Sequence, residues 1–170
     1  MAVPPIQVAV CGPRDATDAD TTHAREIGRL LAEAGATVLC GGGTGVMAAV
    51  AEGASAAGGL VIAVRPDTDP AGVCAGVSAV LYTNLGAARN AVLVGSADAV
   101  IVVGGSWGTL SEYALANGRG VPVVMIGGWQ VLDAAGEPIE GGAVATTPAE
   151  TVDLALTAAT EFRRRLTGAL

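Results

Sequence analysis

Residues 100–112 join an apolar run to a glycine-rich loop and then to a segment of helical composition. A strand that ends in such a loop at the start of a helix brings several backbone N–H groups and the positive end of the helix dipole to one point, which suits a phosphate group. Thr109 adds a hydroxyl there, and Glu112 follows about one helical turn later, within reach of a sugar joined to that phosphate. The segment predicts a phosphate site beside a carboxylate; the alternative is a tight turn whose glycines serve backbone geometry alone.

A second junction of the same kind occurs earlier in the chain. The apolar residues 37–40 are followed by a glycine-rich loop at 41–45, and residues 46–54 have the composition of a short helix. In a parallel sheet such junctions lie at the carboxyl edge, so the two loops can converge on one ligand. Neither loop is a Walker A motif, which requires a lysine, and the first strand leads into residues 12–15 rather than into GxGxxG.

The composition limits the functions open to the chain. Its 170 residues correspond to about one domain, which we place at residues 1–170. The net charge of −7 argues against a nucleic-acid partner, which needs a basic face, so any phosphate site must be locally positive. No uninterrupted apolar run is long enough to span a membrane. The chain also does not begin with the basic segment and following apolar segment that are typical of a signal peptide. We therefore expect a cytoplasmic protein with no membrane partner.

Metal and cofactor chemistry has few ligands available in this sequence. Cys11, Cys40 and Cys74 are irregularly spaced and His23 is the single histidine, so we predict no metal site and interpret the cysteines as buried reduced thiols. All nine basic residues are arginines, and the absence of lysine excludes Schiff-base chemistry on the protein, including pyridoxal phosphate catalysis. We expect no cofactor.

Apolar runs alternate with helical patterns along the whole chain. A continuously apolar run such as residues 99–103 is typical of a strand buried on both faces. The alternation predicts an α/β fold: a single-domain, doubly wound, Rossmann-like and mostly parallel sheet with helices on both faces. The expected strands lie near 6–11, 36–40, 60–64, 78–82, 98–103 and 121–126, the helices near 18–34, 44–57, 85–96, 108–118 and 148–165, and the loops at 66–77 and 127–147.

The expected helix at 85–96 is apolar on nearly every side. It has no acidic residue and one charge, Arg89, and such a helix on a small domain favours burial against a second subunit. We therefore predict a homodimer or a higher homo-oligomer. A lone guanidinium on an apolar element needs an anion. Arg89 therefore contacts a ligand phosphate, or contacts and orients Glu112 in the site, or forms a structural pair with Asp98 or Glu112.

Other residues give weaker signals. Arg14 lies at the same predicted sheet edge, where it either contacts the ligand or is a solvated loop charge. Trp107 and Trp129 lie in glycine-rich loops and can stack on a base or pterin ring, or simply pack. Residues 163–165 are three arginines that fit a solvated helix end. The candidate catalytic residues are thus Glu112 and Arg89, and the candidate ligand-binding residues are Gly12, Arg14, Gly41, Gly42, Gly43, Thr44, Gly45, Arg89, Gly104, Gly105, Ser106, Trp107, Gly108 and Thr109.

These residues resemble the motifs of the LOG-like group of Rossmann-type proteins in the SLOG superfamily, a group often labelled lysine decarboxylase-like. The resemblance spans residues 6–126 and rests on three motifs in order. Residues 41–47 (GGGTGVM) resemble the first glycine motif, residues 88–90 (ARN) resemble the arginine motif, and residues 104–112 (GGSWGTLSE) resemble PGGxGTxxE. The resemblance implies the same fold and a phosphate site.

Departures from the motifs indicate the branch. Phosphoribohydrolases of the group carry a Met-His-x-Arg-Lys pattern, whereas here residues 86–88 (GAA) precede Arg89 and Asn90 follows it. The first glycine motif is one residue shorter than GGGxxGLM, the proline is replaced by Gly104, and the second glycine is replaced by Ser106. This pattern looks like a sister branch that resembles molybdenum cofactor carrier proteins.

The resemblance implies two functions. As an enzyme, the protein would hydrolyse the N-glycosidic bond of a nucleoside 5′-monophosphate: Arg89 and the loops would hold the phosphate, and Glu112 would contact the ribose and stabilise oxocarbenium charge while water attacks the anomeric carbon. As a carrier or sensor, it would hold a nucleotide or a molybdopterin-type ligand without chemistry. The enzyme mechanism expects an ionised Glu112, kept so by the positive field of the helix start. Lysine decarboxylation is excluded in its usual form, because no lysine is available to bind its cofactor.

Overall fold

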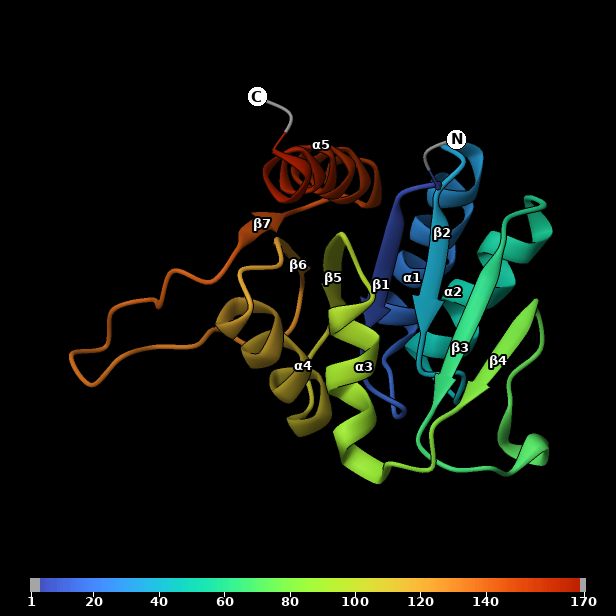
Figure 1. The fold of residues 1–170 in the computed structure, drawn as a ribbon. Coiled ribbons are helices and arrows are strands. Elements are labelled where there is room, and N and C mark those ends of the chain that lie inside the picture. Colours follow the sequence, from blue (N-terminus) through green and yellow to red (C-terminus); the bar gives the residue numbers. More distant parts are fainter. Residues whose placement is uncertain (1–3, 169–170) are drawn as a thin grey trace.

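The computed structural model describes residues 4–168, which form one sheet of seven parallel strands and five α-helices (Figure 1). The strand order is β4-β3-β2-β1-β5-β6-β7. The strands are β1 (Gln7–Cys11), β2 (Thr37–Cys40), β3 (Val61–Arg65), β4 (Ala79–Tyr82), β5 (Ala99–Val103), β6 (Val123–Ile126) and β7 (Ala143–Ala145). The helices are α1 (Asp18–Glu33), α2 (Val46–Ala56), α3 (Arg89–Gly95), α4 (Trp107–Gly118) and α5 (Pro148–Thr167), with the short 3-10 helices η1 (Pro70–Gly72) and η2 (Gly86–Ala88).

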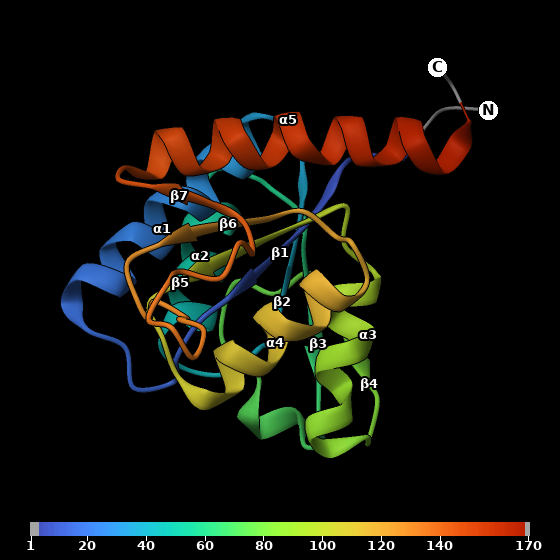
Figure 2. The ribbon, with the colours of Figure 1, turned by 90° about the vertical axis from the view of Figure 1, so that its left-hand side faces the viewer.

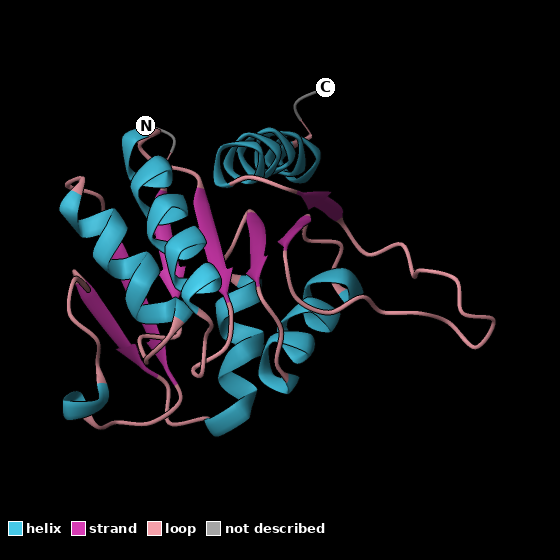
Figure 3. Cartoon of the chain, turned by 180° about the vertical axis from the view of Figure 1, so that it is seen from behind, coloured by secondary structure: helices cyan, strands magenta, loops and turns pink. Residues whose placement is uncertain are grey.

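Helices cover both faces of the sheet. α3 and α4 lie in front of the strands in Figure 1, and α1 and α2 lie in front of them in the view from behind (Figure 3). α5 shares its buried face with α1, since Val152 and Ala155 belong to the same core cluster as Ile27. Figure 2 shows α5 lengthwise, on the side of the sheet away from α3 and α4. This arrangement confirms the predicted α/β fold with helices on both faces.

Small aliphatic side chains build the core, as a sequence with 3% aromatic residues requires. All five residues of β5 are buried, because helices cover the central strand on both sides. The edge strand β4 is exposed along most of its length. α1 begins with a capping box, in which the Thr17 hydroxyl accepts a hydrogen bond from the Asp20 amide and the Asp20 carboxylate accepts one from the Thr17 amide, both 3.1 Å.

Strand order places a crevice between β1 and β5. The chain proceeds from β1 toward β2, β3 and β4 on one side, and from β5 toward β6 and β7 on the other. Val8 pairs with Ala99 and Cys11 pairs with Val102, so the carboxyl ends of these two strands lie side by side. In open parallel sheets, ligands bind where the strand order reverses in this way. The loops that follow β1 and β5 therefore border the expected binding position.

Two sequence expectations about the elements need correction. The helix predicted at 85–96 is α-helical only from Arg89, because Gly86 has φ 55 and cannot belong to a right-handed α-helix. The connection at 127–147 contains the unexpected strand β7, which pairs with β6. Its three apolar residues are too short a run to indicate a strand, and Val144 is 70% exposed at the sheet edge. No helix within residues 4–168 is long and apolar enough to cross a membrane.

Candidate functional site

A cleft of about 440 Å³ opens at the carboxyl ends of β1 and β5. The β1–α1 loop, the start of α3 and the β5–α4 junction form most of its wall. The lining residues are Gly12, Pro13, Arg14, Asp15, Met47, Arg89, Asn90, Gly105, Ser106, Trp107, Gly108, Thr109 and Glu112. The structure thus brings eight of the sequence-predicted residues beside Glu112 into one cleft, at the point where the strand order reverses.

The start of α4 supplies backbone donors to this cleft. Ser106 is the N-cap, with extended backbone, and its Oγ accepts a hydrogen bond of 3.1 Å from the Thr109 amide. The Ser106 and Thr109 hydroxyls also share a hydrogen bond of 2.9 Å. Within residues 4–168, the amides of Trp107 and Gly108 have no acceptor in the protein. Two N–H groups and the positive helix end therefore remain available to an anion, whereas the Thr109 hydroxyl already has a partner.

Arg89 is a buried cation whose hydrogen-bonding capacity is largely unused. It begins α3 and is 9% exposed, and its Nε and Nη1 have no hydrogen-bond partner within the described residues. The proposed structural pair with Asp98 is wrong, because that carboxylate instead bridges Arg163 at 2.6 Å. Within residues 4–168 no ion pair joins Arg89 to Glu112. A buried guanidinium without a partner is unfavourable unless an anion reaches it, so Arg89 points to a ligand.

The loop at 41–45 lies beneath Arg89 instead of lining the cleft. A Cβ on Gly41 would overlap Nη1 of Arg89, so this glycine lets the guanidinium pack on the backbone. Gly45 packs in the same way against the Pro13 and Arg14 carbonyls. The Val46 amide at the start of α2 donates to the Pro13 carbonyl at 3.1 Å. The sequence predicted that residues 41–45 bind the ligand directly, but of the region after β2 only Met47 lines the cleft, and the loop instead supports Arg89.

Arg65 is a buried arginine near the site that was not predicted from the sequence. It ends β3 at the same edge of the sheet and is 5% exposed. Its Nη1 donates to the carbonyls of Gly72 at 2.9 Å and of Gly42 at 3.4 Å, and its Nη2 lies 2.7 Å from the Asp67 carboxylate. Arg65 therefore ties the glycine loop to the loop after β3. The only signal in the sequence is an arginine at the end of an apolar run, and its partners come from loops that the fold brings together.

Glu112 faces the cleft from the second turn of α4. It is 8% exposed, and burial raises its pKa to about 7, against the opposing effects of the Arg89 charge and the Cys11 thiol. The carboxylate that the sequence expected to be ionised thus has a raised pKa, because the loss of water on burial outweighs the Arg89 charge and the Cys11 hydrogen bond. Near neutral pH both the protonated and the ionised form of Glu112 are therefore accessible.

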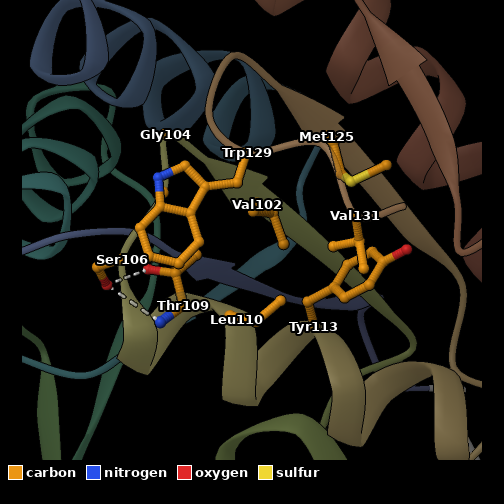
Figure 4. Close-up of a pocket in the computed structure, with 10 residues that line it drawn as sticks. Val102, Gly104, Ser106, Thr109, Leu110, Tyr113, Met125, Trp129 and Val131 are labelled. Atoms are coloured by element: carbon orange, nitrogen blue, oxygen red, sulfur yellow. Dashed lines mark hydrogen bonds between the residues drawn. The ribbon is translucent and has the colours of Figure 1, made fainter. Parts of the chain in front are cut away.

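The two tryptophans contact each other beside the cleft, which Trp107 lines. The rings of Trp107 and Trp129 lie 5.1 Å apart at 78°, an edge-to-face contact. Trp129 also covers a small apolar pocket next to the cleft, formed with Leu110 and Tyr113 (Figure 4). Trp107 is 79% exposed. The two residues are far apart in the sequence, yet they form one aromatic surface.

The remaining candidates occupy different environments. Arg14 lines the cleft with an exposed side chain. Arg163 is not a solvated helix end, because it binds Asp98 and donates to the carbonyls of Pro4 and Pro5. Cys11 and Cys40 are buried and Cys74 is partly buried, all as free thiols. No group of three potential metal-ligating side chains occurs within the part of the chain described.

Comparison with known proteins identifies the family. The model of the SLOG cluster4 family matches residues 5–153. The chain belongs to this family. An uncharacterized protein of Archaeoglobus fulgidus is 37% identical over 141 residues, which cover 79% of this chain and 92% of that protein.

Solved structures similar to this SLOG cluster4 protein include two that bind or carry the molybdenum cofactor. The molybdenum cofactor binding protein of Rippkaea orientalis has a TM-score of 0.82 at 31% identity, over 92% of this chain and 98% of that one. The molybdenum cofactor carrier protein of Chlamydomonas reinhardtii has a TM-score of 0.78 at 29% identity, over 92% and 99%. DNA processing protein A of Helicobacter pylori, which binds single-stranded DNA, has a TM-score of 0.66 at 20% identity over 90% and 81%, and shows only a common fold.

The SLOG cluster4 protein departs from the PGGxGTxxE motif for a structural reason. Gly104 has φ 66, which proline cannot adopt because its ring fixes φ near −65°. A Cβ on Gly128 would overlap the Gly104 carbonyl, so the two backbones pass in direct contact. This contact brings the neighbouring Trp129 onto Gly105, where a Cβ would lie 2.6 Å from the indole. The glycine at 104 thus positions an aromatic side chain beside the cleft.

Proposed function

We propose that the protein binds a phosphorylated small molecule in the cleft between β1 and β5. The observation that carries this proposal is Arg89, whose buried Nε and Nη1 have no partner within residues 4–168. The amides of Trp107 and Gly108 supply further donors at the positive end of α4. A phosphate dianion would satisfy both sets of donors and would neutralise the buried charge. The cleft has the size of a small-molecule site.

Within this proposal the protein acts as a carrier that holds its ligand without chemical change. The similarity to a binding protein and a carrier protein for the molybdenum cofactor supports this function. A phosphorylated pterin-type molecule or a nucleotide would then be the cargo. Nucleic acid is not proposed as a partner, because the chain has a net charge of −7 and its likeness to a DNA-binding protein extends only to the fold.

Hydrolysis of a nucleoside 5′-monophosphate is the second candidate, and Glu112 is the observation that favours it. This buried carboxyl faces the same cleft as Arg89 and has a pKa of about 7. In its ionised form it would contact the ribose hydroxyls and stabilise developing oxocarbenium charge while water attacks the anomeric carbon. Asn90 also lines the cleft, where it donates to Ser111 at 2.8 Å.

One experiment separates the two functions. The protein is incubated with a panel of nucleoside 5′-monophosphates and a phosphorylated pterin, and binding is measured alongside release of free base and ribose 5-phosphate. Tight binding without turnover is the result expected of a carrier. Turnover that falls about 100-fold or more in Glu112→Gln, with affinity kept within about tenfold, would establish the hydrolase. Absence of binding by every phosphorylated ligand would overturn both.

A further inference from the structure

We propose that Trp107 forms a ring-binding subsite beside the phosphate donors, supported by Trp129, so that the ligand carries a planar heteroaromatic ring. This inference rests on the proposed function, because it names the class of phosphorylated molecule that the cleft takes. It assigns the ring to the outer wall of the cleft and the phosphate to the inner wall formed by Arg89 and the start of α4.

The exposure of Trp107 is the first observation. It is 79% exposed, the largest exposed fraction among the large hydrophobic residues of the described chain. Trp107 nevertheless lines the same cleft as Arg89 and Glu112. An indole left in water loses the burial that makes tryptophan stabilising in proteins, whereas a flat ring laid on its face would restore that burial. The side chain is therefore placed for a partner that the isolated chain lacks.

The second observation is the support behind Trp107. Trp129 touches it edge to face, with ring centres 5.1 Å apart, so the two rings do not stack on each other. Trp129 itself packs directly on the Gly105 backbone, where a Cβ would lie 2.6 Å from the indole. Figure 4 shows it above Ser106 and Thr109, at the start of α4. The aromatic surface is thereby anchored to the same turn that presents the phosphate donors.

The third observation is the spacing between the two parts of the site. Trp107 is the first residue of α4, so its own amide is one of the two available donors and its side chain starts at the phosphate position. A cleft of about 440 Å³ is far larger than a phosphate ion needs. A ligand that places its phosphate on Arg89 and extends through a short linker to a ring on Trp107 would fill it. Nucleosides and phosphorylated pterins have this form.

The test compares ligands with and without a ring. Adenosine 5′-monophosphate, guanosine 5′-monophosphate and a phosphorylated pterin are titrated in parallel with ribose 5-phosphate and inorganic phosphate. Trp107→Ala should weaken binding of at least one of the three ring-bearing ligands by about 10- to 100-fold, the usual range for loss of aromatic stacking, and should change ribose 5-phosphate binding less than twofold. Trp107→Phe should restore most of the affinity. Arg89→Ala should weaken every phosphorylated ligand.

Fluorescence gives a second readout of the same contact. In Trp129→Phe, Trp107 is the single tryptophan, and its emission should be quenched by the ring-bearing ligand that binds best but not by ribose 5-phosphate.

Equal affinity of Trp107→Ala and the unmodified protein for all three ring-bearing ligands would overturn the subsite, even if Arg89→Ala confirmed the phosphate site. Loss of self-association in Trp107→Ala with unchanged affinity would assign the residue to a protein interface instead. Failure of every phosphorylated ligand to bind would overturn the proposed function and the subsite together.

Discussion

A buried arginine with two unpartnered nitrogens explains most of the chemistry of this site at the scale of single residues. The guanidinium of Arg89 rests on Gly41, and burial lowers its pKa from the ordinary value while Glu112 opposes that effect. An arginine nevertheless stays charged at physiological pH. Folding therefore leaves a cation in a place with little water and no ion pair within residues 4–168. This arrangement strengthens the binding of an anion, and it lowers the stability of the protein when no ligand is bound.

Replacing Arg89 should therefore separate binding from stability. We expect Arg89→Ala to weaken phosphate binding by about 1.5–3 kcal/mol, the range of a hydrogen bond to a charged group. Its free energy of unfolding should not fall by a similar amount, because no ion pair is lost. Isothermal titration calorimetry and urea unfolding measure the two quantities. Arg164→Ala, on the exposed end of α5, is the matched control and should change neither. Unchanged affinity in a folded Arg89→Ala protein would assign this arginine a structural role.

Glu112 should make anion binding depend on pH. Burial raises its pKa to about 7, so the carboxyl is mostly neutral at pH 6 and mostly ionised at pH 8. An ionised carboxylate in the cleft repels an anion, so affinity should fall by about tenfold as the pH rises through 7. Sulfate is the suitable probe, because it keeps its charge over this range whereas phosphate does not. Glu112→Gln should bind sulfate equally at both pH values, and a flat profile in the unmodified protein would contradict the assignment.

The sequence allowed some site residues to be predicted better than others. Arg89 was identifiable because a single charge on an apolar segment needs an anion. The raised pKa of Glu112 was not identifiable. Its position near a helix start suggested a positive field that keeps it ionised, whereas its burial depends on Cys11 and other residues packed around it. Arg65 was overlooked because its partners, the carbonyls of Gly42 and Gly72, come from loops whose approach only the fold determines.

At the scale of elements, the start of α4 determines how many donors the cleft receives. The Ser106 hydroxyl caps the helix by accepting a hydrogen bond from the Thr109 amide, and the amides of Trp107 and Gly108 remain available to a ligand. Glycine stands at this position in the PGGxGTxxE motif, so the serine adds a capping bond that the motif lacks. The helix is thus stabilised independently of any ligand, while its dipole still points into the cleft.

Substitutions at Ser106 should show the contribution of this cap. Ser106→Ala should lower the free energy of unfolding by about 1 kcal/mol, the usual effect of losing an N-cap side chain, whereas Ser106→Gly should lower it by only a few tenths. Urea unfolding without added phosphate or sulfate measures both variants, with the slope against urea concentration as the check that the unfolding reaction is unchanged. Equal stability of the alanine variant and the unmodified protein would show that the Oγ bond contributes little.

Long, strongly apolar elements could be predicted from the sequence, and short exposed ones could not. The six expected strands are present, and five of them are largely buried because their apolar runs lie between helices, whereas the edge strand β4 stays mostly exposed. β7 was missed because three residues at a sheet edge gain their pairing from β6 and not from their own pattern. The start of α3 was placed too early, because nothing in the residue types at 85–88 indicates that Gly86 takes a positive φ.

At the scale of the whole molecule, the fold leaves apolar side chains exposed at the β4 edge of the sheet. β4 is the last strand on its side, and Leu81 and Tyr82 are 50% and 40% exposed. Leu85, in the turn toward η2, is 51% exposed. Leu93 and Val94 of α3 are buried in the chain's own core, so they no longer require a second subunit. Of the interface predicted at residues 85–96, Leu85 remains exposed, and Leu81 and Tyr82 of β4 extend it into an exposed apolar edge.

We expect the protein to form a homodimer or a higher homo-oligomer through that edge. Unpaired strand edges with exposed apolar side chains are unfavourable in water and are normally protected by charges, by covering segments or by a partner. Sedimentation velocity at micromolar concentration should show a species larger than the monomer, and Leu85→Glu should shift it to the monomer by placing a charge in the contact. Leu166→Glu, an equally drastic change at the end of α5 where the side chain is 69% exposed, should leave the assembly intact. Dissociation by Leu166→Glu but not by Leu85→Glu would move the interface to α5, and a stable monomer of the unmodified protein would refute the prediction.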